Sequence, residues 1–139
     1  MLRKLVPDVV HDQQLLELRP GATVREAAQS MTRRNVRSAL VTENGALLGI
    51  FTGTDLIGRV VAAGLDPDTT PLQQVMTREL ETIAAHENAL EALRRMQFGH
   101  FRHLPVVRDG RLVGIVSRRD FYGFEIDEIE RQEQLWEEM

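Results

Sequence analysis

The chain contains no cysteine, no long apolar run and no excess of basic residues. The lack of cysteine excludes disulfides, thiol nucleophiles and zinc sites built on thiolates, and it agrees with a reducing compartment. No stretch approaches the roughly 20 apolar residues of a membrane helix, and the first residues lack the apolar core of a signal peptide. A net charge of −4 argues against a general nucleic-acid binder. We therefore expect a cytoplasmic protein that binds neither nucleic acid nor membrane.

The usual signatures of catalysis are also missing. The sequence has no nucleophile elbow, no Gly-rich phosphate loop and no group of Asp, His and Glu at metal-ligand spacing. Ser117 has no adjacent base, and His100 and His103 have no obvious third ligand nearby. We expect no enzymatic activity, no metal and no required cofactor.

The chain does contain a repeat with a period of 65 residues. GIFTGTDLIG at 49–58 is matched by GIVSRRDFYG at 114–123, and the same shift holds without a gap over about 36 residues. The matched pairs include Glu26 with Glu91, Met31 with Met96, Arg37 with Arg102, Gly45 with Gly110 and Asp55 with Asp120. Two copies at a period longer than that of most solenoid repeats predict a pseudo-symmetric pair rather than an array.

Each copy predicts the element order β-α-β-β-α, which makes the fold class α+β. An extended stretch comes first, at 15–20 and 80–85, and a helix capped by Thr23 or Asn88 follows. Two apolar runs around Asn44-Gly45 or Asp109-Gly110 then predict a hairpin, because these residues tolerate the positive φ of a tight turn. The closing Ser/Thr-x-x-Asp predicts the start of a second helix. One such copy has too little core, so we expect the two to pack through their sheets.

The predicted boundaries are 7–66 for the first copy, 67–124 for the second and 125–139 for an acidic helical tail. The tail carries seven acidic residues and one basic residue, so the first 124 residues sum to +2. It lacks Pro and Gly, and it should extend the last helix of the second copy. Its interrupted apolar stripe would lie on a dimer partner or fold back on its own module; the stripe comprises Ile126, Ile129, Leu135, Trp136 and Met139.

The paired GIFTGTDLIGRV and GIVSRRDFYGF, together with RHLPVV and TPLQQVMT, resemble a tandem of cystathionine-β-synthase (CBS) domains, known as a Bateman module. The resemblance covers roughly residues 7 to 124. It implies a standalone regulatory protein that binds an adenosine-containing ligand in clefts between the repeats and signals to an unidentified protein partner. The ligand would be AMP, ADP or ATP, alternatively NAD or S-adenosylmethionine, and the protein would be a homodimer. The alternative is a ligand-free module for protein interaction or dimerisation.

The Ser/Thr-x-x-Asp motif can be read in two ways. As a helix cap, its hydroxyl accepts from an N–H three residues on and its carboxylate bonds back. As a ligand site, the same geometry presents free N–H groups to a phosphate. In the family resembled, the Asp binds the ribose and the Ser or Thr lies near the phosphate. This assigns Thr52 and Asp55 in the first copy, and Ser117 and Asp120 in the second.

The second copy is the stronger candidate because it carries more cations. Arg118 and Arg119 replace Gly53-Thr54 of the first copy, and guanidinium groups bind phosphate well, although both could be merely solvated. Further candidates are basic residues beside the hairpin: Arg102 and His103, with Arg37 as the counterpart in the first copy. An adenine slot would use Ile83, Leu104 and Val116, with Leu18, Ala39 and Phe51 as counterparts, although each could equally be plain core.

Overall fold

The computed structural model describes residues 2–11, 13–78 and 80–138. The chain divides into two compact units. Residues 14–80 form the first-repeat unit, and residues 1–13 with 81–139 form the second-repeat unit. Within the residues described, no helix is long and apolar enough to cross a membrane.

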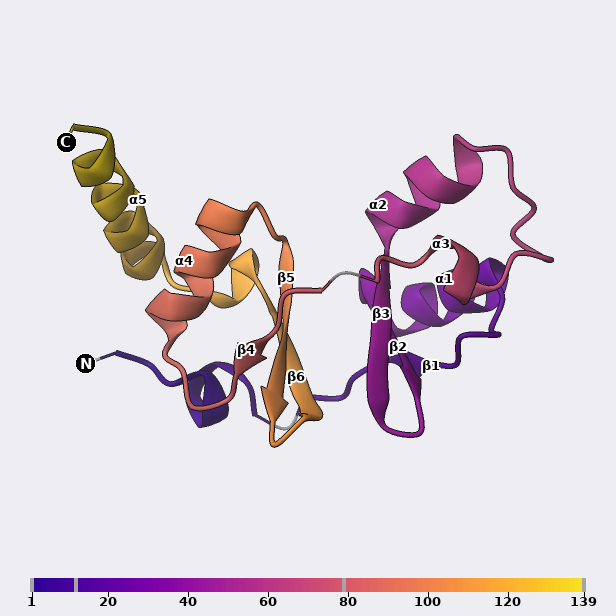
Figure 1. Ribbon diagram of the computed structural model, residues 1–139, viewed down its shortest axis with the longest axis horizontal. Helices are drawn as coiled ribbons and strands as arrows, with labels where there is room; N and C mark the ends of the chain where they lie inside the picture. The colour runs from indigo at the N-terminus through magenta and orange to yellow at the C-terminus, as the bar shows by residue number, and fades with distance from the viewer. Residues whose placement is uncertain (1, 12, 79, 139) are drawn as a thin grey trace. The chain divides into compact units, whose positions relative to one another are not determined.

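Both units have the predicted α+β composition, with a three-stranded sheet in each (Figure 1). The first-repeat unit consists of β1 (Glu17–Leu18), α1 (Val24–Arg34), β2 (Ser38–Glu43), β3 (Ala46–Thr52), α2 (Gly53–Asp55), η2 (Leu56–Val61) and α3 (Leu72–Val75). The second-repeat unit consists of η1 (Leu5–Val9), β4 (Ile83–Ala84), α4 (Ala89–Gly99), β5 (His103–Arg108), β6 (Arg111–Ser117), η3 (Arg118–Asp120) and α5 (Gly123–Glu138).

The two sheets have the same topology and the same register. The short outer strand pairs in parallel with the middle strand, which pairs antiparallel with the third. Ser38 lies opposite Thr52 in one sheet, and His103 lies opposite Ser117 in the other, at the 65-residue shift that the sequence predicts. The hairpin turns also agree with the prediction, since Asn44 and Gly45 have φ of 52° and 82°.

The helices α1 and α4 begin where their caps predict. The Thr23 hydroxyl accepts from the Glu26 N–H at 3.2 Å, and the Asn88 side chain accepts from the Glu91 N–H at 2.9 Å. Each helix ends at a residue in the left-handed region, which is Asn35 or His100. Their apolar faces are buried against the sheets; these faces comprise Val24, Ala27 and Met31 in α1 and Ala89, Ala92, Leu93 and Met96 in α4.

In each unit, the segment that packs before the first helix, α1 or α4, is distant in sequence from that helix. We call residues 3–10 and 70–77 the lead segments. The Ala89 N–H donates to the Arg3 carbonyl, as the Val24 N–H donates to the Thr70 carbonyl. Leu5 and Leu72 are both fully buried at matching positions. The sequence boundary at 66/67 therefore differs from the structural division, because the lead segment 70–77 belongs to the first-repeat unit and 3–10 to the second.

The helical segments that follow the two hairpins differ between the copies. In the first copy, α2 and η2 make one continuous helical run from Gly53 to Val61, as predicted. In the second copy the prediction is wrong in detail. Ser117 opens only the three-residue turn η3, because Phe121 is extended (φ −105°, ψ 150°) and places its side chain in the core. The helix α5 begins afterwards, at Gly123, and includes the acidic tail as predicted.

The lead segment of the first-repeat unit passes directly over Gly49. A Cβ at this position would lie 2.7 Å from the Met76 sulfur and 2.7 Å from the Thr77 carbonyl oxygen. The segment cannot easily retreat, because Thr77 and Ile50 exchange two main-chain hydrogen bonds. We expect Gly49→Ala to destabilise the protein by about 1–3 kcal/mol, measured by urea unfolding. Gly58→Ala is the control, since nothing lies within 4 Å of its Cβ; equal stability of both variants would contradict this docking.

Candidate nucleotide site

The aspartate of the first motif is buried and committed to its own unit. Asp55 is 7% exposed. Its Oδ2 accepts from the Thr52 N–H at 2.9 Å and from the Thr52 hydroxyl at 3.2 Å. Its Oδ1 accepts from the Thr77 hydroxyl at 3.1 Å and lies 3.6 Å from Nε of Arg59. Both carboxylate oxygens of Asp55 are therefore used to hold the lead segment and the helical run in place.

The aspartate of the second motif is exposed and only half engaged. Asp120 Oδ2 accepts from the Ser117 N–H at 2.7 Å and from the Ser117 hydroxyl at 3.4 Å. Within the described chain, no donor bonds to Oδ1 of Asp120. The positions that hold Asp55 have changed, since Phe124 stands where Arg59 does. Asp120 is therefore an exposed residue whose Oδ1 has no donor among the described residues.

Gln13, three residues after the lead segment 3–10, makes the pairing in the second-repeat unit that Thr77 makes in the first. In the first-repeat unit, Thr77 pairs with Ile50 through its main chain and with Asp55 through its hydroxyl. In the second, the Gln13 side-chain amide pairs with both main-chain groups of Ile115, at 2.8 and 2.9 Å. A side-chain amide thus reproduces the strand-like pairing of Thr77 without placing a hydroxyl on the aspartate.

Three cationic or titratable side chains surround the second motif. His103 begins β5 opposite Ser117, and Arg102 precedes it. Burial lowers the pKa of His103 below its ordinary value, and the charge of Arg119, partly offset by Asp120, lowers it further, with a smaller contribution from Arg102. The side chains of Arg119, Asp120 and Arg102 are therefore close enough to His103 to interact with it electrostatically. The structure thus brings together predicted residues that lie 14 or more positions apart in the sequence.

Arg118 makes its contacts within its own unit. Its guanidinium donates to the Gln97 side-chain oxygen at 2.6 Å and to Glu130 at 3.4 Å. It therefore links η3 to α4 and α5, whereas Arg119 is exposed and makes no such link among the described residues. An anion at the motif would reach Arg119 without breaking an ion pair, but it would compete with Glu130 for Arg118.

The remaining predicted residues lie in the core or at the margin of the first motif. The proposed adenine residues of the second copy, Ile83, Leu104 and Val116, are at most 1% exposed and belong to the core of the second-repeat unit. Their counterparts Ala39 and Phe51 are fully buried, and Leu18 packs on the same core. Arg37 is exposed, and its carbonyl accepts from the Gly53 N–H at 3.3 Å, beside the first motif.

Comparison with known proteins agrees with the repeat and the fold. A family model described as CBS domain matches the chain twice, at residues 6–62 and 72–125. The chain belongs to the CBS domain family. Its two motifs are therefore the closing motifs of a CBS pair.

The CBS pair is similar to proteins from plants, bacteria and archaea. It is 43% identical over 73% of its length to the CBS domain-containing protein CBSCBSPB3 of Arabidopsis thaliana, of which it spans only 18%. It is 36% identical to YhcV of Bacillus subtilis, covering 77% of this chain and 76% of that protein.

Solved structures agree with the fold of the CBS pair. An uncharacterised protein of Pyrococcus horikoshii is 31% identical, with a TM-score of 0.77 over 86% of this chain and 89% of its own. A CBS domain protein of Pyrobaculum aerophilum complexed with AMP is 26% identical, with a TM-score of 0.76 over 87% of this chain and 95% of its own.

Two surface hollows lie away from the Asp motifs of the CBS pair. One, of about 380 Å³, lies in the second-repeat unit, and the other, of about 670 Å³, lies in the first-repeat unit. They are equivalent under the 65-residue shift, because both lie between the outer strand and the hairpin turn at Asp109 or Asn44. Neither is lined by a predicted site residue, so they are a property of the fold rather than of the motif.

Sequence reasoning missed the residues that hold the motifs. The spacing of Asp55 and Arg59, four apart on one helical run, could have indicated their ion pair. Arg3 and Glu125 gave no such signal, because 122 positions separate them. Their side chains form a bidentate pair at 2.7 and 3.1 Å, and the Arg3 guanidinium also lies 3.8 Å from the ring centre of Tyr122.

The Arg3–Glu125 pair predicts a specific loss of stability in acid. Burial raises the pKa of Glu125, but hydrogen bonds from Arg3 and the Tyr122 N–H and the Arg3 charge outweigh it, so this pKa lies below its ordinary value of 4.5. A carboxylate with a lowered folded-state pKa stabilises the protein fully above its unfolded pKa, and this contribution is lost as pH falls through the folded value. We expect wild type to lose more stability between pH 5 and about pH 3 than a Glu125→Gln variant, in urea unfolding. Parallel pH profiles would contradict this.

Proposed function

We propose that this CBS pair is a regulatory, non-catalytic module that binds an adenosine nucleotide at the second motif. The observation that carries the proposal is the difference between the two aspartates. Asp55 uses both oxygens for internal contacts, whereas Asp120 is exposed and its Oδ1 accepts no hydrogen bond from the described residues. A carboxylate of this kind accepts hydrogen bonds from the two hydroxyls of a ribose.

The residues around Asp120 fit a phosphate. Arg119, Arg102 and His103 supply positive charge or donors at one edge of the motif. Because η3 has only three residues, the phosphate would be held by side chains and not by a helix N-terminus. The AMP complex of the Pyrobaculum aerophilum protein supports AMP as the first ligand to test, with ADP and ATP next.

Calorimetry with AMP, ADP, ATP, NAD and S-adenosylmethionine tests this function directly. We expect AMP to bind with a stoichiometry of one per chain, because only one motif has a carboxylate to offer. Two equivalent sites per chain would contradict the asymmetry between Asp55 and Asp120. No heat and no thermal shift with any of the five compounds would refute nucleotide binding.

A second candidate function is interaction through the end of α5, and we propose a second copy of the chain as the partner. Gln97 at the end of α4 bonds Glu133, and α5 continues beyond this contact. Trp136 is 72% exposed although it lies seven residues after the buried Ile129, on the same helical face. A helical face whose apolar residues continue beyond the buried core into solvent is typical of a contact surface. Two solved structures are described as a hexameric CBS-CP12 protein from bloom-forming cyanobacteria, so a related fold does assemble.

Removing residues 134–139 tests the α5 surface without disturbing the core. The cut must lie after Glu133, because a deletion from residue 125 would also remove the buried Glu125 and Ile129. We expect the truncated protein to keep its free energy of unfolding within about 0.5 kcal/mol, since residues 134–138 are exposed. Light scattering should show a dimer for wild type and a monomer for the truncated chain. An unchanged mass would exclude α5 as the assembly surface.

A further inference from the structure

Arg3 connects the lead segment to the loop that carries Asp120. Besides its pair with Glu125, the Arg3 guanidinium donates to the main-chain carbonyl of Asp120 at 3.1 Å. Glu125 in turn accepts from the Tyr122 N–H at 2.8 Å. The Arg3 carbonyl accepts from the Ala89 N–H, which ties the same residue to the start of α4. One side chain thus joins the lead segment, the Asp120 loop and α5.

The first copy shows that the fold does not require this connection. At the matching positions it has Thr70 for Arg3, Val60 for Glu125 and Ile57 for Tyr122. Thr70 and Val60 are buried, at 5% and 1% exposure, and the first-repeat unit has the same sheet and the same first helix. The buried ion pair is therefore an addition specific to the second copy. Besides its contribution to stability, the pair gives the second copy a way of holding its motif loop that the first copy lacks.

The two copies fix their motif loops through different atoms of the aspartate. In the first, Thr77 and Arg59 hold Asp55 by its carboxylate, which is then unavailable. In the second, Arg3 holds Asp120 by its main-chain carbonyl, so the loop is fixed while the carboxylate stays open. We propose that Arg3 is a positioning residue for the nucleotide site, which orients the Asp120 carboxylate without occupying it. This inference rests on the proposed nucleotide-binding function.

A double variant that copies the first repeat separates positioning from stability. Arg3→Thr with Glu125→Val removes both partners, so neither charge is left without the other. We expect AMP affinity to fall about tenfold, because the loop is no longer preorganised for the ligand. Hydrogen exchange of the amides of residues 118–121 should become faster in the ligand-free protein. The thermal midpoint should stay close to that of wild type.

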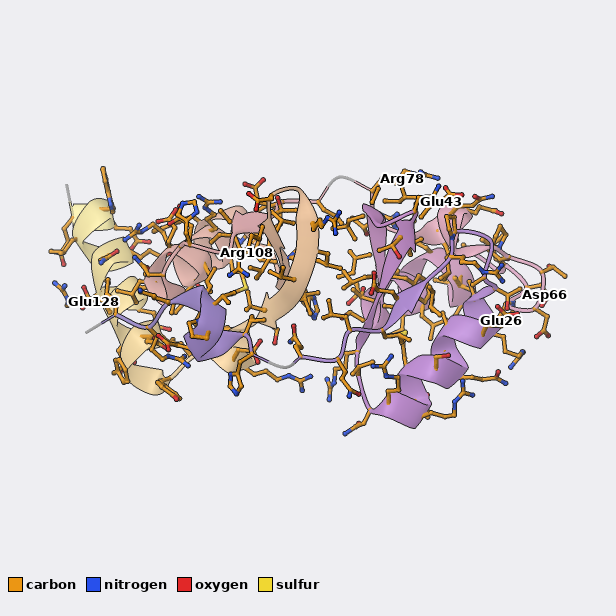
Figure 2. All side chains as sticks on the ribbon, turned by 90° about the horizontal axis from the view of Figure 1, so that it is seen from below. Glu26, Glu43, Asp66, Arg78, Arg108 and Glu128 are labelled. Carbon is orange, nitrogen blue, oxygen red and sulfur yellow. The ribbon has the colours of Figure 1, made fainter. Side chains whose placement is uncertain are left out.

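Arg3→Lys provides the conservative comparison. A lysine can pair with Glu125, but it lacks the fork that reaches the Asp120 carbonyl at the same time. We expect this variant to unfold at a somewhat lower temperature than wild type, because the bidentate pair and the stacking on Tyr122 are lost, and to bind AMP more weakly at temperatures where it is folded. Arg25→Ala is the matched control, since it breaks an exposed ion pair with Asp68 in the first-repeat unit, where the loop at 66–69 lies beside the start of α1 (Figure 2). Its AMP affinity should equal that of wild type.

Each outcome decides between the two proposals. Wild type that binds AMP, with a double variant of equal affinity, would overturn the role of Arg3 and leave the proposed function standing. Faster exchange without a loss of affinity would also overturn it, because the loop would then be irrelevant to the ligand. Wild type that binds none of the five compounds would remove the proposed function, and the positioning role with it. Weaker AMP binding by the double variant at unchanged stability supports the inference.

Discussion

Replacing Asp120 with alanine should weaken AMP binding by about tenfold to a hundredfold, because charge-assisted hydrogen bonds to the ribose contribute roughly 1.5–3 kcal/mol. The folded protein should tolerate this change, since Asp120 is exposed and the hydrogen bonds of its side chain, among the described residues, are to Ser117; the main-chain carbonyl that Arg3 contacts is retained. Calorimetry at fixed pH and salt measures the affinity, and thermal unfolding of the same sample measures stability.

Asp55→Ala is the matched comparison, and the opposite pattern is expected for it. Loss of the buried carboxylate removes the acceptor of Thr52 and Thr77 and leaves the Arg59 guanidinium without its ion-pair partner. We expect a loss of about 1–3 kcal/mol in the free energy of unfolding, with AMP affinity unchanged at temperatures where the variant is folded. If Asp55→Ala instead abolished binding while Asp120→Ala did not, the site would be at the first motif and our assignment would be reversed.

Phe51→Ala should cause the largest loss of stability in the chain. The Phe51 ring is fully buried in the core of the first-repeat unit, beside the apolar faces of α1 and α3. Removing a buried aromatic ring costs about 3–5 kcal/mol, which is a large share of the roughly 5–15 kcal/mol that stabilises a typical domain. Urea unfolding followed by circular dichroism should show a transition at lower denaturant for the first-repeat unit.

Phe124→Ala is the control for this prediction. Phe124 is 67% exposed, so its removal should change the free energy of unfolding by no more than about 0.5 kcal/mol. The Phe51→Ala variant also tests an alternative role, because the sequence makes Phe51 a candidate adenine contact of the first copy. A stable Phe51→Ala protein that had lost nucleotide binding would show that the ring acts on a ligand and not on the core.

The parts of the fold that were predictable from sequence depend on interactions within a few residues. Thr23 with Glu26 and Asn88 with Glu91 set the starts of α1 and α4, because a cap and its target lie three residues apart. Asn44-Gly45 sets its hairpin turn, because these residues accept positive φ. The repeat then transferred each assignment to the other copy, which is why both sheets have the predicted register.

The features of the fold and site that were not predictable depend on which segment, distant in sequence, packs against each motif. The same Ser/Thr-x-x-Asp pattern opens a long helical run after Thr52 but a three-residue turn after Ser117, where Phe121 turns into the core. Asp55 and Asp120 are equivalent in sequence, yet one is buried and the other exposed. Thr77 and Arg59 contact the first carboxylate, whereas in the second unit Gln13 pairs with Ile115 and Phe124 stands at the position of Arg59 in the repeat.

The sequence by itself determined the duplication, the caps, the hairpins and the family, since these follow from local chemistry repeated at a constant spacing. Only the tertiary structure decided which aspartate is buried with both oxygens engaged and which is exposed. That outcome depends on contacts between residues such as Arg3 and Glu125, which are 122 positions apart, and on how the lead segments are exchanged between the repeats. Burial and pairing of a charged group are properties of its surroundings, so two aspartates at equivalent positions of a repeat differ in exposure and in hydrogen bonding.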